Sequence, residues 1–345
     1  MTEATVRASA PLRISFVGGG TDFPHYYERN GGAVLSATID HRAHVDVTPR
    51  EDRQVTIRSL DLGHLVEYHL GEGPIYDGVM DLPKAAIARI GTGAGLDVDI
   101  ASDAPPGSGL GGSSALVTAC VGALAALADL PLSTFEVARL AYAIERDDLR
   151  IAGGWQDQYA AAFGGFNLLE FSSDGVAVTP VVLEEGALSE LRSHLLLCYT
   201  GRVRTDLGLI DTQIRMYREG REETIVGMKQ LHEMAYEMRD ALEAGDLGSL
   251  GGLLRQAYES KKRMNPHIAE GTPIERLMDA AHEAGAAGGK ICGAGGGGYL
   301  LLACRPDAQP VVRAALEALG GQLAEFSFRN RGVEARVGDR VWRPA

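Results

Sequence analysis

A glycine-rich loop that runs directly into an apolar helix constrains this sequence most. Residues 103–115 read Asp-Ala-Pro-Pro-Gly-Ser-Gly-Leu-Gly-Gly-Ser-Ser-Ala, and an alanine- and leucine-rich stretch follows them. Glycines let the backbone turn tightly, and a helix N-terminus offers unpaired N–H groups and a positive dipole end to an anion. The pattern predicts a phosphate-binding loop over Pro106, Gly107, Ser108, Gly109, Leu110, Gly111, Gly112, Ser113 and Ser114.

The residue types in this loop can be compared with those of other phosphate-binding motifs. A P-loop needs Gly-Lys followed by Ser or Thr, and the chain has no lysine between Lys84 and Lys229. The segment does satisfy the Gly-x-Gly-x-x-Gly pattern of dinucleotide-binding folds. However, Asp129, which has about the right spacing for a ribose-binding carboxylate, follows an alanine-rich helix instead of ending a strand. A glycine-rich turn that only packs a helix on a sheet remains as the structural alternative.

Composition is that of a soluble, acidic protein. A chain of 345 residues with 45% hydrophobic residues can form two cores, and a net charge of -13 without a dense Lys/Arg run argues against nucleic-acid binding. The N-terminus lacks a signal-peptide pattern, and the longest apolar run, 115–128, is too short to span a bilayer. We therefore expect a cytoplasmic protein with no membrane partner, as a monomer or homodimer.

The four cysteines show neither a disulfide nor a zinc pattern. They lie among apolar residues and form no Cys-x-x-Cys pair. Small buried side chains are the better interpretation for all of them, namely Cys120, Cys198, Cys292 and Cys304.

The pattern of elements predicts an α/β first half and an α+β second half. Strand-like runs at 44–48, 54–58 and 65–69 precede the glycine loop. A change of composition near 184–186 suggests two domains, 1–185 and 186–345. The second contains amphipathic helices and closes with a β-α-β segment of ferredoxin-like character.

Local signals place several elements more exactly. Ser133 and Glu136 form a capping box that opens a helix reaching Glu145 in its last turns, and Thr272 with Glu275 predicts a second capping box. Alternation in residues 11–16 predicts a half-buried strand that directs Arg13 and Ser15 to one side.

Three motifs in order give this chain a family resemblance. Pro-Pro-Gly-Ser-Gly-Leu-Gly-Gly-Ser-Ser-Ala (105–115) resembles the ATP-binding motif of the GHMP kinases, and Ala10 to Asp22 resembles their N-terminal substrate motif. Lys-Ile-Cys-Gly-Ala-Gly-Gly-Gly-Gly-Tyr (290–299) resembles their C-terminal glycine motif. The resemblance implies ATP and Mg²⁺ as cofactors. It also implies an N-terminal α/β domain like domain 2 of ribosomal protein S5, and a ferredoxin-like C-terminal domain.

The resemblance also assigns the catalytic pair. Asp157 matches the carboxylate that the family places beside the acceptor hydroxyl as a candidate base, and its alternative is a carboxylate complementing a helix dipole. Arg13 matches an arginine that lies near this aspartate and the transferred phosphate, where it would stabilise transition-state oxygens. A surface arginine on an edge strand is the alternative for Arg13.

A magnesium site is implied in the same way. Glu145 aligns with the family's metal-binding glutamate, and Ser114, or less favourably Ser113, would add a hydroxyl. The alternative for Glu145 is a solvated helix face beside Arg146.

Sugar recognition is implied for three segments. Asp22 resembles the carboxylate that binds sugar hydroxyls, with a simple Asx turn as the alternative. The other residues that the resemblance assigns to the substrate are Gly19, Gly20, Thr21, Gly153, Gly154, Gln156, Gly295 and Gly296.

The first motif is more similar to the heptose-phosphate kinases of the family than to its galactokinases. Its Ile-Ser-Phe-Val-Gly-Gly-Gly-Thr-Asp run (14–22) and the Gly-Gly-Trp-Gln-Asp-Gln-Tyr segment (153–159) carry this likeness. The implied reaction is phosphorylation of the anomeric hydroxyl of a heptose 7-phosphate. An octose 8-phosphate from lincosamide-type sugar biosynthesis, a sugar such as fucose, and a catalytically silent sugar or nucleotide sensor remain as alternatives.

A substrate that already carries a phosphate needs a second cationic pocket. Candidates are Arg202 and Arg204 after a strand, the 261–263 cluster (Lys-Lys-Arg) and Lys290. Arg204 is preferred because a guanidinium can bind phosphate in a bidentate way. The alternative for the cluster is favourable charge at a helix C-terminus.

Overall fold

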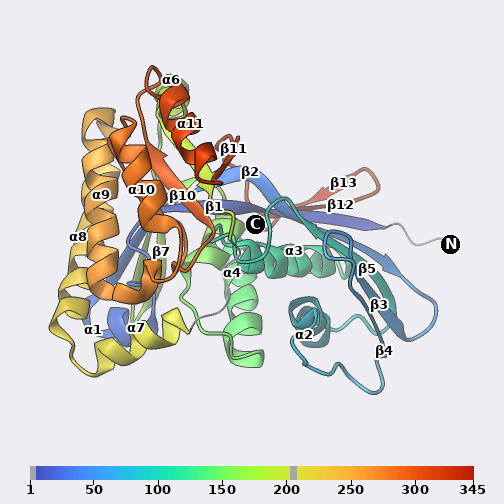
Figure 1. Ribbon diagram of the computed structural model, residues 1–345. Coiled ribbons are helices and arrows are strands. Elements are labelled where there is room, and N and C mark those ends of the chain that lie inside the picture. Colours follow the sequence, from blue (N-terminus) through green and yellow to red (C-terminus); the bar gives the residue numbers. More distant parts are fainter. Residues whose placement is uncertain (1–4, 203–207) are drawn as a thin grey trace.

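Two sheets of unequal size form the framework of the protein. The computed structural model describes residues 5–202 and 208–345 (Figure 1). Arg204 therefore lies outside the described residues. In the described part of the chain, the first sheet comprises β1 (Val6–Val17), β2 (Gly32–Pro49), β3 (Gln54–Ser59), β4 (Leu65–His69), β5 (Leu96–Ser102), β6 (Phe166–Ser172), β7 (Gly175–Pro180), β12 (Glu334–Val337) and β13 (Arg340–Trp342).

The order of this sheet is β13-β12-β1-β2-β5-β3-β4, and β6 pairs with β2 and β7. Strand β2 is long enough to pair along its first half with β6 and along its second half with β5. The β3–β5 pair is parallel, and the other described pairs in this sheet are antiparallel. Strand β1, which carries Arg13, lies in the interior of the sheet.

The second sheet contains β8 (Leu195–Tyr199), β9 (Gly288–Ile291), β10 (Tyr299–Ala303) and β11 (Gln322–Ala324) in the order β11-β8-β10-β9. Numbered in chain order within the sheet, this arrangement is 4-1-3-2 with antiparallel pairing, which is ferredoxin-like as the sequence predicts. The glycine segment 292–298 connects β9 to its antiparallel neighbour β10.

Helices cover both sheets (Figure 1). They are α1 (Pro24–Asn30), α2 (Asp81–Ile90), α3 (Gly112–Leu127), α4 (Thr134–Ala143), α5 (Gln156–Phe163), α6 (Glu185–Ser193), α7 (Leu209–Arg218), α8 (Glu222–Glu243), α9 (Leu247–Met264), α10 (Ile274–Glu283) and α11 (Gln309–Ala318). A π-helical turn spans Ile144–Asp148 and a 3₁₀ turn spans Pro266–Ala269. None of the described helices combines the length and apolar character that crossing a bilayer requires.

Helix α3 is the centre of the first domain. It packs on β1 and β2, and the helices α2, α4 and α5 and strand β12 surround it. Most of its side chains are buried, which agrees with an apolar sequence that shows little amphipathic pattern. The four cysteines are free and buried, as expected from their apolar surroundings.

The chain returns to its first sheet at the end. Strands β12 and β13, beyond residue 333, extend the first sheet through antiparallel pairing of β12 with β1. The expected second domain, 186–345, thus contributes two strands to the sheet of the first domain. The domain boundary at residue 185 stays a prediction.

Three local expectations need correction. Strand β1 is buried on both faces from Ala10 onward, because the face that carries Arg13 and Ser15 lines a cavity and not the solvent. The second capping box does not form, since α10 begins after Pro273, which as N-cap supplies no side-chain acceptor. The helix that reaches Glu145 ends as α4 at Ala143, and Glu145 lies in the π-helical turn.

The first capping box is present with both of its contacts. The Ser133 hydroxyl accepts from the Glu136 N–H, and the Glu136 carboxylate accepts from the Ser133 N–H. We expect Ser133→Ala to lower the free energy of unfolding by about 1 kcal/mol, because an N-terminal N–H of α4 loses its partner. Urea denaturation measures the loss. Ser133→Thr, which keeps an acceptor, serves as the control, and equal losses in both variants would contradict this account.

Candidate active site

A cavity of about 490 Å³ lies where the two sheets approach each other. The first sheet contributes Arg13 and Ser15 from β1, and the second contributes Lys290 from β9 and the start of the glycine segment after it. The glycine loop before α3 and the segment 151–157 form further walls. The motifs at 10–22, 105–115 and 290–294, which are far apart in sequence, therefore meet at one site.

The predicted phosphate loop forms one wall of this cavity. Pro106, Gly107, Ser108, Gly109, Gly111, Gly112, Ser113 and Ser114 line it. Gly111 adopts a left-handed conformation (φ 74°, ψ 21°) at the N-cap of α3, and the first residues of the helix, 112–114, line the cavity with it. Leu110 does not line the cavity, contrary to expectation. Its side chain is buried, and its carbonyl oxygen accepts a hydrogen bond from the Arg13 backbone N–H at 2.9 Å.

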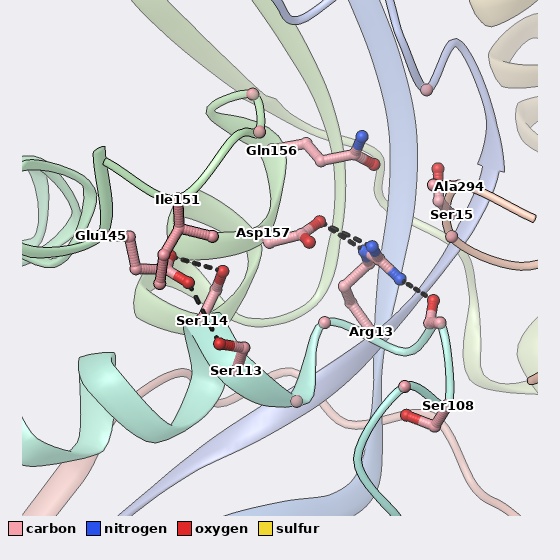
Figure 2. A pocket seen from close by; sticks show the side chains of 18 of the residues that line it. Arg13, Ser15, Ser108, Ser113, Ser114, Glu145, Ile151, Gln156, Asp157 and Ala294 are labelled. Carbon is pink, nitrogen blue, oxygen red and sulfur yellow. Dashed lines mark hydrogen bonds and ion pairs between the residues drawn. The ribbon is translucent and has the colours of Figure 1, made fainter. Parts of the chain in front are cut away.

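Arg13 joins the loop to the candidate base. Its Nη2 and Nε atoms lie 2.7 Å and 2.8 Å from the same carboxylate oxygen of Asp157 (Figure 2). Its Nη1 atom donates to the carbonyl oxygen of Gly109 at 2.6 Å. The Arg13 side chain is only 4% exposed, whereas that of Asp157 is 25% exposed and faces the cavity. A buried guanidinium thus fixes the carboxylate beside the phosphate loop, and the interpretation of Arg13 as a surface residue is wrong.

The expected metal ligands form a second pair. The Ser114 hydroxyl donates to Glu145 Oε2 at 2.7 Å, and the more exposed Ser113 hydroxyl lies 3.3 Å from Oε1 (Figure 2). Glu145 is 1% exposed, so it does not lie on a solvated helix face. The π-helical turn and the Gln158 amide, which donates to Glu145 Oε2, hold this carboxylate toward the loop.

The oxygens of Ser114 and Glu145 suit a hard cation such as Mg²⁺. Both residues line the cavity. Within residues 5–202 and 208–345, no group of three or more His, Cys, Asp or Glu side chains could hold a metal alone. Such an ion would therefore take its remaining ligands from water and phosphate, as Mg²⁺ does at nucleotide sites.

Asp22 and Gln156 line the part of the cavity near Gly19 and Gly20. Asp22 accepts from the Gly20 N–H at 2.9 Å and from the backbone and side chain of Gln156 at 3.2 Å and 3.1 Å. Burial and the nearby charge of Asp157 raise the pKa of Asp22. The simple Asx turn does not describe Asp22, because Gln156 from a distant segment shares its carboxylate.

Gly153 and Gly154 line the cavity beside this carboxylate. At Gly154 a Cβ atom would lie 2.0 Å from Asp22 Oδ2, so this close approach requires glycine. The backbone carbonyls of Ile151 and Gly154 accept from the Arg146 guanidinium at 3.1 Å and 3.3 Å. Arg146 therefore holds the segment that leads into Asp157.

Three residues expected to contact substrate do not line the cavity. Thr21 is fully buried, and its hydroxyl donates to the carbonyls of Gly18 and Ala33. Gly295 packs against Ile268, and the Gly296 N–H donates to the Ile268 carbonyl oxygen at 2.7 Å. Gly293 and Ala294, which precede them, line the cavity instead.

Sequence reasoning missed the apolar end of the cavity. The hairpin between β3 and β4, helix α2 and strand β5 supply four apolar residues to its wall, with Ser59 and Asp61 beside them: Leu62, Leu82, Ile100 and Ala101. These residues form no motif, because only the tertiary structure brings the hairpin beside the phosphate loop. An apolar wall next to a phosphate loop is suited to a planar nucleotide base.

Among the cations proposed for a second phosphate, two line the cavity. Lys261, near the end of α9, and Lys290 are 5% and 4% exposed. Lys262 instead points to Glu259 and Glu275, and the Arg202 guanidinium donates to the Gly271 carbonyl oxygen. Burial and the mutual repulsion of the two lysines lower the pKa of Lys261 to about 7, and burial lowers that of Lys290 to about 8.

Comparison with known proteins agrees with this geometry. The sequence matches the GHMP kinases N terminal domain over residues 79–165 and the GHMP kinases C terminal domain over 238–322. It is 36% identical to the D-glycero-alpha-D-manno-heptose 7-phosphate kinase of Campylobacter jejuni, covering 96% of this chain and 98% of that protein. It is 28% identical to the L-fucokinase/L-fucose-1-P guanylyltransferase of Bacteroides fragilis, covering 90% of this chain and 36% of that protein.

A solved structure gives the same result. The D-glycero-D-manno-heptose 1-phosphate kinase of Bacteroides thetaiotaomicron superimposes with a TM-score of 0.79 at 31% identity, covering 96% of this chain and 98% of that one. The resemblance inferred from the three motifs is confirmed, and the chain belongs to the GHMP kinases.

Proposed function

We propose that this protein transfers the γ-phosphoryl group of ATP to the anomeric hydroxyl of D-glycero-D-manno-heptose 7-phosphate. The observation that carries the proposal is the Arg13–Asp157 contact beside the phosphate loop, at a cavity that also contains Asp22. The Campylobacter jejuni relative, which this chain matches along almost its whole length, is a D-glycero-alpha-D-manno-heptose 7-phosphate kinase, and this likeness supports the choice of sugar.

Each group of residues at the site would have its own role in phosphoryl transfer. Phosphoryl transfer depends mainly on positioning and charge neutralisation. The phosphate loop and the N-terminus of α3 would hold the phosphates of ATP. Ser114 and Glu145 would hold Mg²⁺, which when bound neutralises phosphate charge.

Asp157 would orient the anomeric hydroxyl and accept its proton as the oxygen bonds to phosphorus and ADP leaves. Arg13 keeps this carboxylate in place through two contacts and presents positive charge to the transferred group. Because an anomeric hydroxyl is more acidic than an ordinary alcohol, the reaction makes a modest demand on the base.

Asp157→Asn tests this role. We expect kcat to fall about 10²–10⁴-fold, because the variant cannot accept the proton, while the KM for ATP changes little. Steady-state kinetics with ATP and the heptose phosphate measure both. Asp147→Asn removes an exposed carboxylate from the nearby π-helical turn and is the matched control. Near wild-type turnover of the Asp157→Asn enzyme would contradict the assignment of Asp157 as the proton acceptor.

Glu145→Gln tests the metal site. Loss of a charged ligand is expected to raise the Mg²⁺ concentration for half-maximal activity about 10- to 100-fold, since contacts to charged groups contribute about 1.5–3 kcal/mol. Calorimetric titration of Mg²⁺ into enzyme saturated with a non-hydrolysable ATP analogue gives a readout that is independent of turnover. Unchanged metal affinity in both assays would show that Glu145 has another role. Asp147→Asn again serves as the control.

An acceptor panel tests the substrate. ADP release is measured with heptose 7-phosphate, an octose 8-phosphate, fucose, mannose and galactose. We expect the highest kcat/KM for heptose 7-phosphate. A preference for the octose phosphate or for fucose would replace the proposed substrate and leave the roles of Arg13 and Asp157 intact. ATP binding without turnover of any acceptor would instead indicate a sensor.

A further inference from the structure

Two buried lysines occupy the cavity wall without a role in the reaction described above. The Lys290 ammonium donates to the backbone carbonyl of Ser15 at 2.6 Å, and no side-chain hydrogen bond or ion pair of Lys261 is found within the described residues. Buried ammonium groups are costly unless an opposite charge pairs with them. Arg13, the third buried cation here, is already paired with Asp157.

Asp22 is the carboxylate whose charge acts on Lys261, and it cannot balance both lysines. It is buried among hydrogen bonds to Gly20 and Gln156, and its oxygens accept from those groups. Lys261 feels the positive charges of Lys290 and Arg13 as well as the negative charge of Asp22. Beyond Arg13, this described part of the cavity wall therefore contains two lysines and one carboxylate, although the protein as a whole has a net charge of -13.

The position of the lysines separates them from the metal pair. In Figure 2, Ser114 and Glu145 lie on one side of the Asp157–Arg13 contact, and Ser15, whose carbonyl binds Lys290, lies on the other. Met264, which follows Lys261 on α9, packs close to Gly20. The Gln213 amide donates to the Gly20 carbonyl on the same side. The lysines thus face the part of the cavity that contains Gly20 and Asp22.

We propose that Lys261 and Lys290 bind the phosphomonoester that the sugar acceptor already carries, on the opposite side of Arg13 from the metal pair. This proposal rests on the proposed function only in assuming that the acceptor is a sugar phosphate. It assigns the phosphate to two described residues whose side chains line the cavity, and Arg204, the ligand preferred from the sequence, lies outside the described residues. In this arrangement Arg13 lies between two phosphate sites, one for the group that is transferred and one for the group that anchors the sugar.

The lowered pKa values add a signature that a merely structural lysine would not give. At pH 8 an ammonium with a pKa of about 7, such as Lys261, is mostly neutral, and Lys290 with a pKa of about 8 is half protonated. A bound phosphate favours the charged form, so binding must take up protons. The groups that act on Lys261 are Lys290, Asp22, Arg13 and Cys292. Affinity for the sugar phosphate should therefore fall as the pH rises through 8.

The test compares Lys261→Met and Lys290→Met with Lys262→Met, an adjacent lysine that points to Glu259 and Glu275 instead of the cavity. The probes are heptose 7-phosphate and unphosphorylated heptose. Calorimetry in nucleotide-free enzyme measures binding, and kinetics measure kcat/KM. For the phosphorylated sugar, we expect the affinity and kcat/KM of each cavity variant to fall about 10- to 100-fold. The affinity for the parent sugar and the KM for ATP should change little.

Calorimetry at pH 8 in two buffers of different ionisation enthalpy should show net proton uptake in the wild type and less in Lys261→Met. Equal losses on both sugars, or a rise in the KM for ATP alone, would overturn the proposal and assign the lysines to folding or to the γ-phosphate. Wild-type enzyme that binds the 7-phosphate no better than the parent sugar would also overturn it. Tight binding of the 7-phosphate without its turnover would instead reject the proposed function and leave the lysine site standing.

Discussion

The site depends on the contacts of one buried guanidinium. Arg13 binds the Asp157 carboxylate through two nitrogens and the Gly109 carbonyl oxygen through the third, while its backbone N–H donates to Leu110. A charge that is almost fully removed from water must be paired, and the planar fork of arginine satisfies several acceptors at fixed angles. One strand residue thereby sets the position of the candidate base relative to the phosphate loop.

The strand that carries this guanidinium is held by neighbouring elements. Strand β1 pairs with β2 at Arg13, which lies opposite Thr38, while the returning strand β12 pairs with β1 only at residues 6–9. Helix α3 packs on β1 and begins at the loop that Arg13 holds. The late return of the chain therefore supports the beginning of the strand that carries Arg13 and the helix that follows the phosphate loop.

The charged groups of the cavity differ in how completely they are paired. Glu145 has the Ser114 hydroxyl and the Gln158 amide as partners, and Asp157 has Arg13, so the anions of the site are hydrogen-bonded. Lys261 has no such partner in the described residues. An enzyme that binds anions gains from leaving cations incompletely paired until the ligand arrives, and it accepts some loss of stability in exchange.

The sequence by itself determined the local elements and the type of chemistry. The glycine run before an apolar helix, the Ser133 capping box and the three motifs depend on interactions over a few residues, which sequence patterns report directly. Only the tertiary structure decided which side chains face the cavity. Thr21 and Gly296 do not line the cavity, because each donates a hydrogen bond to a nearby carbonyl oxygen, whereas Lys261 lines the cavity from α9. The apolar wall around Leu62 could not be predicted either, because contacts between distant segments leave no local signal in the sequence.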